Sequence, residues 1–272
     1  MPTGGRVAQL VRASRLHREG PGFESLRAHI QANLFMTPQI IYEDSNILVV
    51  NKPYGLITHP KNITDTQPSL SDWVIRNYPE LKEVGEPFDA SGSLLPRGGI
   101  VHRLDKDTSG LIVIAKTQDS FDFLKKLFQT RNIQKHYYAL VYGKPKNNSG
   151  IIDLPLGRIG MKRTTRIEGK KLIDSKESVT GYRVIRTYDK YTLLDVSPKT
   201  GRTHQIRVHL QSIGCPIAGD PVYTPKGWQK PPGLTRLFLH AYKIQLTSID
   251  GKSLVLEADL PEELQKVLNM IQ

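Results

Sequence analysis

Two short segments concentrate the polar and ionisable side chains that could do chemistry. Gly98–Gly110 reads GGIVHRLDKDTSG and holds His102, Arg103 and Asp105 just before an apolar run. Thr200–Leu210 reads TGRTHQIRVHL and holds Arg202, His204, Gln205 and Arg207. An ordinary turn explains DTSG, and a capped helix with a basic face explains the second segment. A turn does not also need a histidine, an arginine and an aspartate, so we treat both segments as candidate site segments.

Several other kinds of site are excluded by the motifs that the chain lacks. It has no GxGxxG for a dinucleotide, no GxxxxGK[ST] for a nucleotide phosphate and no HExxH for zinc. His204 and His209 are five residues apart without an acid between them, which is a poor zinc spacing. The sequence therefore predicts neither a metal nor an organic cofactor.

The two segments resemble the signature motifs of the RluA-type pseudouridine synthases, HRLDxxTSG and GRTHQIRxH. Lys135–Gly143 matches a third motif of that family, KxYxALVxG, and Asn51–Gly55 matches its NKPxG turn. Pro216–Tyr223 and Leu239–Ala241 match its late elements. These matches occur in the family's order from about residue 40 to about residue 260.

The resemblance implies an isomerase that converts uridine to pseudouridine in structured RNA without a cofactor. It implies that Asp105 is the catalytic carboxylate, that Arg207 pairs with it, and that Tyr137 stacks on the uracil. Asp105 could attack C1′, attack the uracil ring or abstract a sugar proton, and the sequence leaves these routes open. For the residues around them, the resemblance implies that Arg103 fills the place of the flipped base and that the pocket or phosphate contacts come from His102, Arg202, His204 and Gln205. For His204 and Gln205, hydrogen bonds that brace the loops are an equal alternative.

The expected RNA is large-subunit ribosomal RNA, with transfer RNA as the alternative substrate. A non-catalytic RNA-binding or ribosome-assembly factor is the competing function from another class. Many relatives carry an S4-type RNA-binding domain ahead of the catalytic body, and the residues after Met36 leave no room for one. We therefore expect RNA selection to rest on the catalytic body and its loops.

Composition supports an RNA partner. The 272 residues carry a net charge of +12, and residues 36–272 alone hold 33 Lys and Arg against 24 Asp and Glu. Such an excess favours a polyanionic partner. No apolar run approaches the ~20 residues of a membrane span, and the single cysteine, Cys215, fits a reducing cytoplasm. We expect a cytoplasmic monomer that does not contact membranes.

Hydrophobic patterning predicts one α+β body over residues 36–272, with a mixed, mainly antiparallel sheet, flanking helices and a central cleft. Strands are expected at 40–42, 47–50, 111–115, 137–142, 179–185, 192–196 and 243–246. Helices are expected from Ser69 or Ser71 to Tyr78, around Phe121–Phe128, and from a Thr203 cap to Ile213. Residues 79–97 contain three prolines and two glycines, and we expect a loop there.

Residues 1–35 differ from the rest of the chain, with five arginines and no lysine. Arg12 and Arg15 interrupt any signal-peptide core. Residues 7–13 back-translate to the D-arm of a bacterial tRNA gene, and residues 22–25 back-translate to its TΨC arm at the right spacing. We interpret 1–35 as a disordered, non-native extension read through from an upstream tRNA gene, with Met36 as the true start. A mitochondrial presequence and a short basic helix are the alternatives.

Overall fold

The computed structural model describes residues 36–160, 162–165 and 172–272. Within it, Pro38–Gln272 forms one compact unit. Residues 1–35 lie outside the described residues, so the tRNA-gene interpretation stays a prediction. In the described part of the chain, no helix is both long and apolar enough to cross a bilayer.

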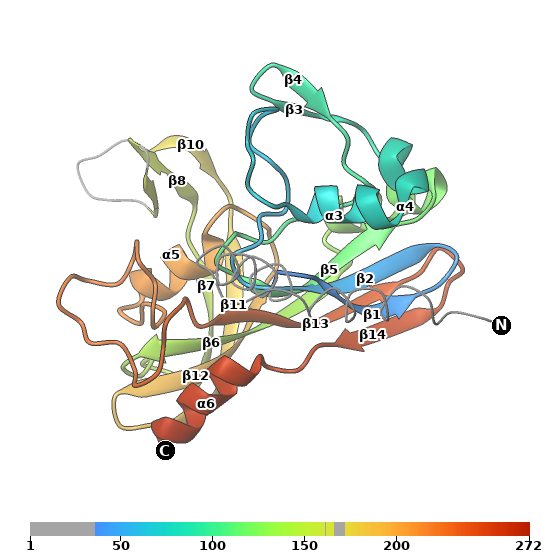
Figure 1. Ribbon diagram of the computed structural model, residues 1–272. Helices are drawn as coiled ribbons and strands as arrows, with labels where there is room; N and C mark the ends of the chain where they lie inside the picture. The colour runs from blue at the N-terminus through green and yellow to red at the C-terminus, as the bar shows by residue number, and fades with distance from the viewer. Residues whose placement is uncertain (1–35, 161, 166–171) are drawn as a thin grey trace, which may run out of the picture. The chain divides into compact units, whose positions relative to one another are not determined.

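A nine-stranded sheet forms the centre of the described unit (Figure 1). Its main path runs, in spatial order, through β1 (Gln39–Glu43), β2 (Ile47–Lys52), β5 (Ser109–Ala115), β13 (Leu239–Thr247), β6 (Gln134–Tyr142), β12 (Tyr191–Pro198), β11 (Val179–Thr187) and β7 (Ser149–Asp153). β14 (Ser253–Glu257) pairs with β13 beside this path. β5 and β13 run parallel, and the other pairs described in this sheet are antiparallel. The expected mixed, mainly antiparallel sheet is confirmed.

β5 occupies the middle of the sheet because its sequence, SGLIVIA, has no exposed side chain. A strand covered on both faces reads as such a continuous apolar run. Gly110, the second residue of this strand, has φ +123°, and a Cβ atom there would lie 2.3 Å from the carbonyl oxygen of Ala241 in β13. Only glycine allows β5 and β13 to approach so closely at the point where the Asp105 loop enters the sheet.

Two helices begin at side-chain caps, of which the one at Ser69 was expected. α3 (Leu70–Asn77) begins after Ser69, whose hydroxyl accepts a hydrogen bond from the Asp72 amide at 3.1 Å. α4 (Gln118–Gln129) begins after Thr117, whose hydroxyl accepts from the Ser120 amide at 3.1 Å. α4 packs its apolar face on β2 and β5. α6 (Glu262–Met270) was not expected from the sequence.

The expected cap of the next helix was wrong by one residue. α5 spans Gln205–Ser212, and its N-cap is His204 in the left-handed conformation, with φ 59° and ψ 17°. This residue reverses the chain direction immediately before the helix, so Thr203 lies one position too early to cap it. The expected helix over this segment is otherwise confirmed.

The expected loop at 79–97 was also wrong in part. It contains a 3₁₀ helix, η2 (Pro79–Glu83), and a hairpin of β3 (Phe88–Ala90) with β4 (Ser93–Leu95). Ser91 and Gly92 both have positive φ, which is typical of a two-residue hairpin turn. A separate small sheet pairs β8 (Leu156–Ile159) with β9 (Lys162–Thr164) and β10 (Ile173–Lys176). In Figure 1, this small sheet and the β3–β4 hairpin are drawn above the large sheet, and α6 below it.

Candidate active site

A cavity of about 530 Å³ opens over the central strands of the large sheet. Its walls come from the loop that precedes β5, from β6, and from the segment between β12 and α5. The lining includes every residue that the sequence singled out, namely His102, Arg103, Asp105, Tyr137, Arg202, His204, Gln205 and Arg207. The expected central cleft is therefore present, and the two candidate segments meet in it.

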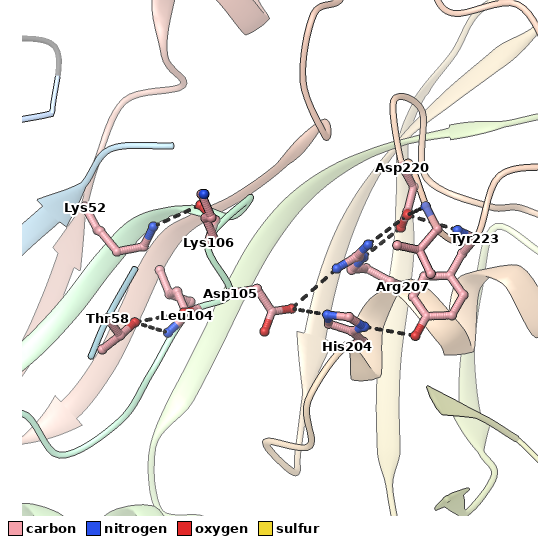
Figure 2. Close-up of polar contacts among 10 residues, drawn as sticks. Lys52, Thr58, Leu104, Asp105, Lys106, His204, Arg207, Asp220 and Tyr223 are labelled. Atoms are coloured by element: carbon pink, nitrogen blue, oxygen red, sulfur yellow. Dashed lines mark hydrogen bonds and ion pairs between the residues drawn. The ribbon is translucent and has the colours of Figure 1, made fainter. Parts of the chain in front are cut away.

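The loop that carries Asp105 is held by the turn after β2. The hydroxyl of Thr58 donates to the carbonyl oxygen of Leu104 at 2.8 Å, and the amide of Gly55 donates to that of Lys106 at 2.9 Å. These contacts fix the backbone on both sides of Asp105, and Figure 2 shows the one between Thr58 and Leu104. The early NKPxG turn thus positions the candidate catalytic residue, although it lies some 50 residues earlier in the chain.

Lys52 is fully buried in this turn. Its ammonium donates to the carbonyl oxygens of Pro53 at 2.9 Å and Leu56 at 2.8 Å. Burial, with a smaller contribution from Arg236, lowers the pKa of Lys52 to about 7, and Asp105 and Asp107 act in the opposite direction. No role was expected for this lysine from the sequence. Its position in a β-rich run, between Asn51 and Pro53, could have indicated that it is buried.

Asp105 faces two nitrogen groups from α5 and its cap. Its Oδ2 atom lies 3.9 Å from Nη1 of Arg207 and 3.9 Å from Nε2 of His204. The side chain of Asp105 is 22% exposed, so the carboxylate is open to the cavity. The expected proximity of Asp105 and Arg207 is present, at the outer limit of an ion pair and beyond hydrogen-bond length.

Arg207 has a closer partner that the sequence did not reveal. Its Nε and Nη2 atoms donate to the two carboxylate oxygens of Asp220 at 2.7 and 2.8 Å, and both side chains are buried. Burial tends to raise the pKa of Asp220, but Arg207 and the amides of Val222 and Tyr223 lower it on balance. The sequence feature that could have indicated this partner is the single aspartate in the otherwise apolar stretch Pro216–Tyr223.

Tyr137 lines the cavity from β6, whereas its neighbour Tyr138 stacks on Tyr242 with ring centroids 3.8 Å apart. Alternate residues of a strand point to opposite faces, so only one of the two tyrosines can serve the site. Burial raises the pKa of Tyr137, and the negative charge of Asp105 raises it further. The phenol is therefore protonated at neutral pH.

His102 and Gln205 are engaged in internal hydrogen bonds. Nε2 of His102 accepts from the amide of Val113 at 2.9 Å, and its ring stacks on Phe128. The Gln205 carbonyl accepts from Thr200 and from the Arg202 amide, and its amide donates to β11. Both side chains brace the walls of the cavity, which favours the bracing alternative for Gln205.

Basic side chains outnumber acidic ones in the lining of the cavity. Among the described residues that line it, one is acidic, Asp105, and seven are basic: Arg103, Lys125, Arg131, Lys135, Lys199, Arg202 and Arg207. Arg103 and Arg202 are exposed. A cleft lined by charges of one sign attracts an oppositely charged polymer and concentrates it at the site.

Comparison with known proteins assigns the family. The family model described as RNA pseudouridylate synthase matches residues 46–212. Ribosomal large subunit pseudouridine synthase D of Nitrosomonas europaea is 40% identical over 241 residues, which is 86% of this chain and 65% of that protein. The protein of the same name from Pseudomonas aeruginosa is 36% identical over 86% of this chain and 72% of its own length. The chain thus spans just under two thirds of the Nitrosomonas protein.

Solved structures agree with this assignment. Human RNA Pseudouridylate Synthase Domain Containing 4 superposes with a TM-score of 0.66 and 27% identity, over 91% of this chain and 97% of that one. The sequence motifs, the mixed sheet and the aspartate-centred cleft are all accounted for by one family. The chain belongs to the RNA pseudouridylate synthase family.

Proposed function

We propose that this chain isomerises uridine to pseudouridine within RNA, with Asp105 as the catalytic carboxylate. The observation that carries the proposal is the placement of Asp105. It is the single acid among the described lining residues of a basic cavity, shares that lining with Tyr137, and lies 3.9 Å from Arg207. A protein that only bound RNA would gain nothing from a carboxylate at the centre of its positive cleft.

The reaction breaks the bond between N1 of uracil and C1′ of ribose, turns the base, and joins C5 to C1′. C5 then loses its proton to solvent, and N1 gains one, so atoms and electrons balance without a redox partner. Asp105 could start the reaction by attacking C1′, by attacking the ring or by removing a sugar proton. Each route needs an unprotonated carboxylate close to the junction of ribose and base.

The surrounding side chains support distinct roles. Tyr137 offers an aromatic face to the uracil, and Arg207 offers positive charge beside Asp105. Because a base in folded RNA must leave its stack at a cost of a few kcal/mol, the exposed Arg103 would fill the vacated place. Arg202 and His204 would contact the flipped nucleotide or its phosphates, while His102 and Gln205 support the walls.

The substrate we propose is large-subunit ribosomal RNA, because the relatives named for an RNA substrate are ribosomal large subunit pseudouridine synthases. The net charge of +12 fits any large structured RNA. We further propose a monomer that works in the cytoplasm, where the single free cysteine, the buried Cys215, would stay reduced.

A tritium-release assay tests the activity. RNA labelled at C5 of uridine loses tritium only when C5 becomes bonded to C1′, so release reports turnover directly. We expect release from ribosomal RNA transcripts by the wild type and none by Asp105→Asn. Release from tRNA alone would reassign the substrate, and tight RNA binding without release from any RNA would favour the assembly factor.

A further inference from the structure

The side chains around Asp105 form a closed ring of polar contacts (Figure 2). From Asp105 the ring passes through Arg207 to Asp220. It continues through the backbone amide of Tyr223 to its side chain, and returns through His204 to the same oxygen of Asp105. Asp220 and Tyr223 lie beyond residue 212, where the family match ends.

Asp220 determines which edge of the Arg207 guanidinium faces the cavity. It accepts from Nε and Nη2, which leaves Nη1 as the nitrogen directed at Asp105. Such a two-pronged pair has a narrow geometry, because two parallel hydrogen bonds fix the plane of the guanidinium. Asp220 is itself fixed, since its Oδ1 atom also accepts from the amides of Val222 and Tyr223 at 2.8 and 3.0 Å.

Tyr223 determines the orientation of His204 in the same way. Its hydroxyl lies 2.9 Å from Nδ1 of His204, while Nε2 points to Asp105. In a neutral imidazole one nitrogen donates and the other accepts, so with Nδ1 accepting from the tyrosine hydroxyl, Nε2 carries the proton and directs it toward Asp105. Burial raises the pKa of Tyr223 to about 12, which keeps its hydroxyl available as the donor.

We propose that Asp220 and Tyr223 are positioning residues of the isomerisation, which direct Arg207 and His204 to one oxygen of Asp105. The inference rests on the proposed function. Both contacts end on Oδ2 at 3.9 Å, so Arg207 supplies positive charge and His204 an N–H dipole without occupying the lone pairs of Asp105 in hydrogen bonds. The other oxygen, Oδ1, remains free to react. Preorganised charge of this kind avoids reorganisation during the reaction.

A double-mutant cycle tests the role of Asp220. Single-turnover rates of tritium release are measured for the wild type, Asp220→Asn, Arg207→Lys and the double variant. We expect Asp220→Asn to lower the rate roughly 10- to 100-fold, as a misplacement of about 1 Å does, with its RNA Kd within about twofold of the wild type. In the double variant, Asp220→Asn should lower the rate by less than about twofold relative to Arg207→Lys, because the lysine has already removed the two-pronged pair.

Asp195→Asn is the matched control. Asp195 is also a buried aspartate with several partners, but it lies beyond the cavity and accepts from His136 at 2.9 Å and Tyr242 at 3.3 Å. We expect this variant to lose stability and to keep its rate. A second double-mutant cycle pairs Tyr223→Phe with His204→Ala. There too, the rate reductions of the two single variants should not multiply in the double variant.

The outcomes separate the two proposals. A wild type that releases no tritium from any RNA refutes the proposed function itself. An active wild type with a folded Asp220→Asn of unchanged rate, or with losses that multiply in the double variant, overturns the positioning role. If Asp220→Asn does not fold, the Tyr223→Phe cycle decides, because it removes a single hydroxyl and leaves the ring beside Arg207.

Discussion

Asp105 and Asp220 both lie close to Arg207, but at different distances. Arg207 hydrogen-bonds Asp220 at 2.7 and 2.8 Å and approaches Asp105 only to 3.9 Å. The sequence predicted that Arg207 would pair with Asp105 and pointed to no other partner. The structure places Arg207 within 3.9 Å of Asp105 and adds Asp220 as a closer, buried partner. The carboxylate of Asp105, which is 22% exposed, is therefore not needed to neutralise Arg207.

Asp105→Asn should consequently abolish turnover without unfolding the protein. The amide can act as neither nucleophile nor base, while Arg207 keeps Asp220 as its partner. We expect the free energy of unfolding to change by less than ~1 kcal/mol and RNA affinity to hold or rise. Circular dichroism melts, filter binding and tritium release on one preparation check this, and residual turnover at the wild-type level would disprove the assignment of Asp105.

His102 makes the free energy of unfolding depend on pH. Burial lowers its folded-state pKa to about 3, well below the usual 6.5. Between these values the unfolded chain binds a proton that the folded protein does not, so stability is lost as the pH falls below 6.5. The loss is at most ~1.4 kcal/mol per pH unit for one group.

His102→Gln isolates this contribution, because the glutamine can still accept from the Val113 amide and does not titrate. We expect wild-type stability to fall more steeply than that of the variant between pH 6.5 and pH 4. Urea unfolding at several pH values measures the difference, and parallel curves would show that His102 is not the group responsible.

The Asp105 loop is held at both of its ends, on one side by the turn after β2 and on the other by the pairing of β5 with β13. The turn after β2 holds the backbone around Asp105, and Gly110 lets β5 meet β13. The parallel pairing between these strands covers only two residue pairs, His240 with Ser109 and Ala241 with Gly110. A small displacement at Gly110 would therefore move the whole loop.

Gly110→Ala should destabilise the protein far more than Gly143→Ala. Both glycines have positive φ, which costs an alanine about 1–2 kcal/mol. Gly143 has open space around it, whereas a Cβ atom at Gly110 would lie 2.3 Å from a backbone oxygen. The clash adds about 1–3 kcal/mol more and should lower turnover as well. Equal melting temperatures for the two variants would contradict the close approach of β5 and β13.

Elements with strong local signals could be predicted from the sequence. The unbroken apolar run of β5 and the cap at Ser69 are properties of a few adjacent residues. The hairpin at 88–95 was missed because glycines and prolines in a row resemble a loop. α5 was misplaced by one residue because His204 adopts a left-handed conformation for which no adjacent residue gives a signal.

Some features of the candidate site could likewise be predicted from the sequence, and others could not. Its motif residues could be located, because the family's spacing identifies them one by one. The Asp220–Arg207 pair could not, because it joins residues that only the fold brings together, and an aspartate beside Pro221 also suits a turn. The bracing role of His102 likewise depends on Val113 and Phe128.

Basic side chains gather around the cavity that holds Asp105. The seven basic residues of the cavity lie on several separate segments of the chain. Positive charges placed around one opening act together on a polyanion, while scattered surface lysines are screened beyond about 10 Å at 0.1 M salt. RNA affinity should therefore depend on the cavity rim more than on net charge.

Lys199→Ala should reduce the salt dependence of RNA binding, whereas Lys266→Ala should not. Lys199 is exposed and lines the cavity, while Lys266 is an exposed lysine of α6 that pairs with Glu262. Each phosphate contact contributes about 0.9 to the slope of log Kd against log salt. Filter binding between 50 and 300 mM KCl should show a slope lower by about 1 for Lys199→Ala alone, and identical slopes would remove Lys199 from the RNA contacts.

The parallel contact between β5 and β13 also bears on how the protein is made. Its partners are 131 residues apart in the chain, since Ser109 pairs with His240. Contacts of such long range slow folding, because the intervening chain must be ordered before they form. During synthesis, the Asp105 loop leaves the ribosome long before the strand that seats it. The Asp105 loop should therefore reach its final position in the sheet only after β13 has emerged.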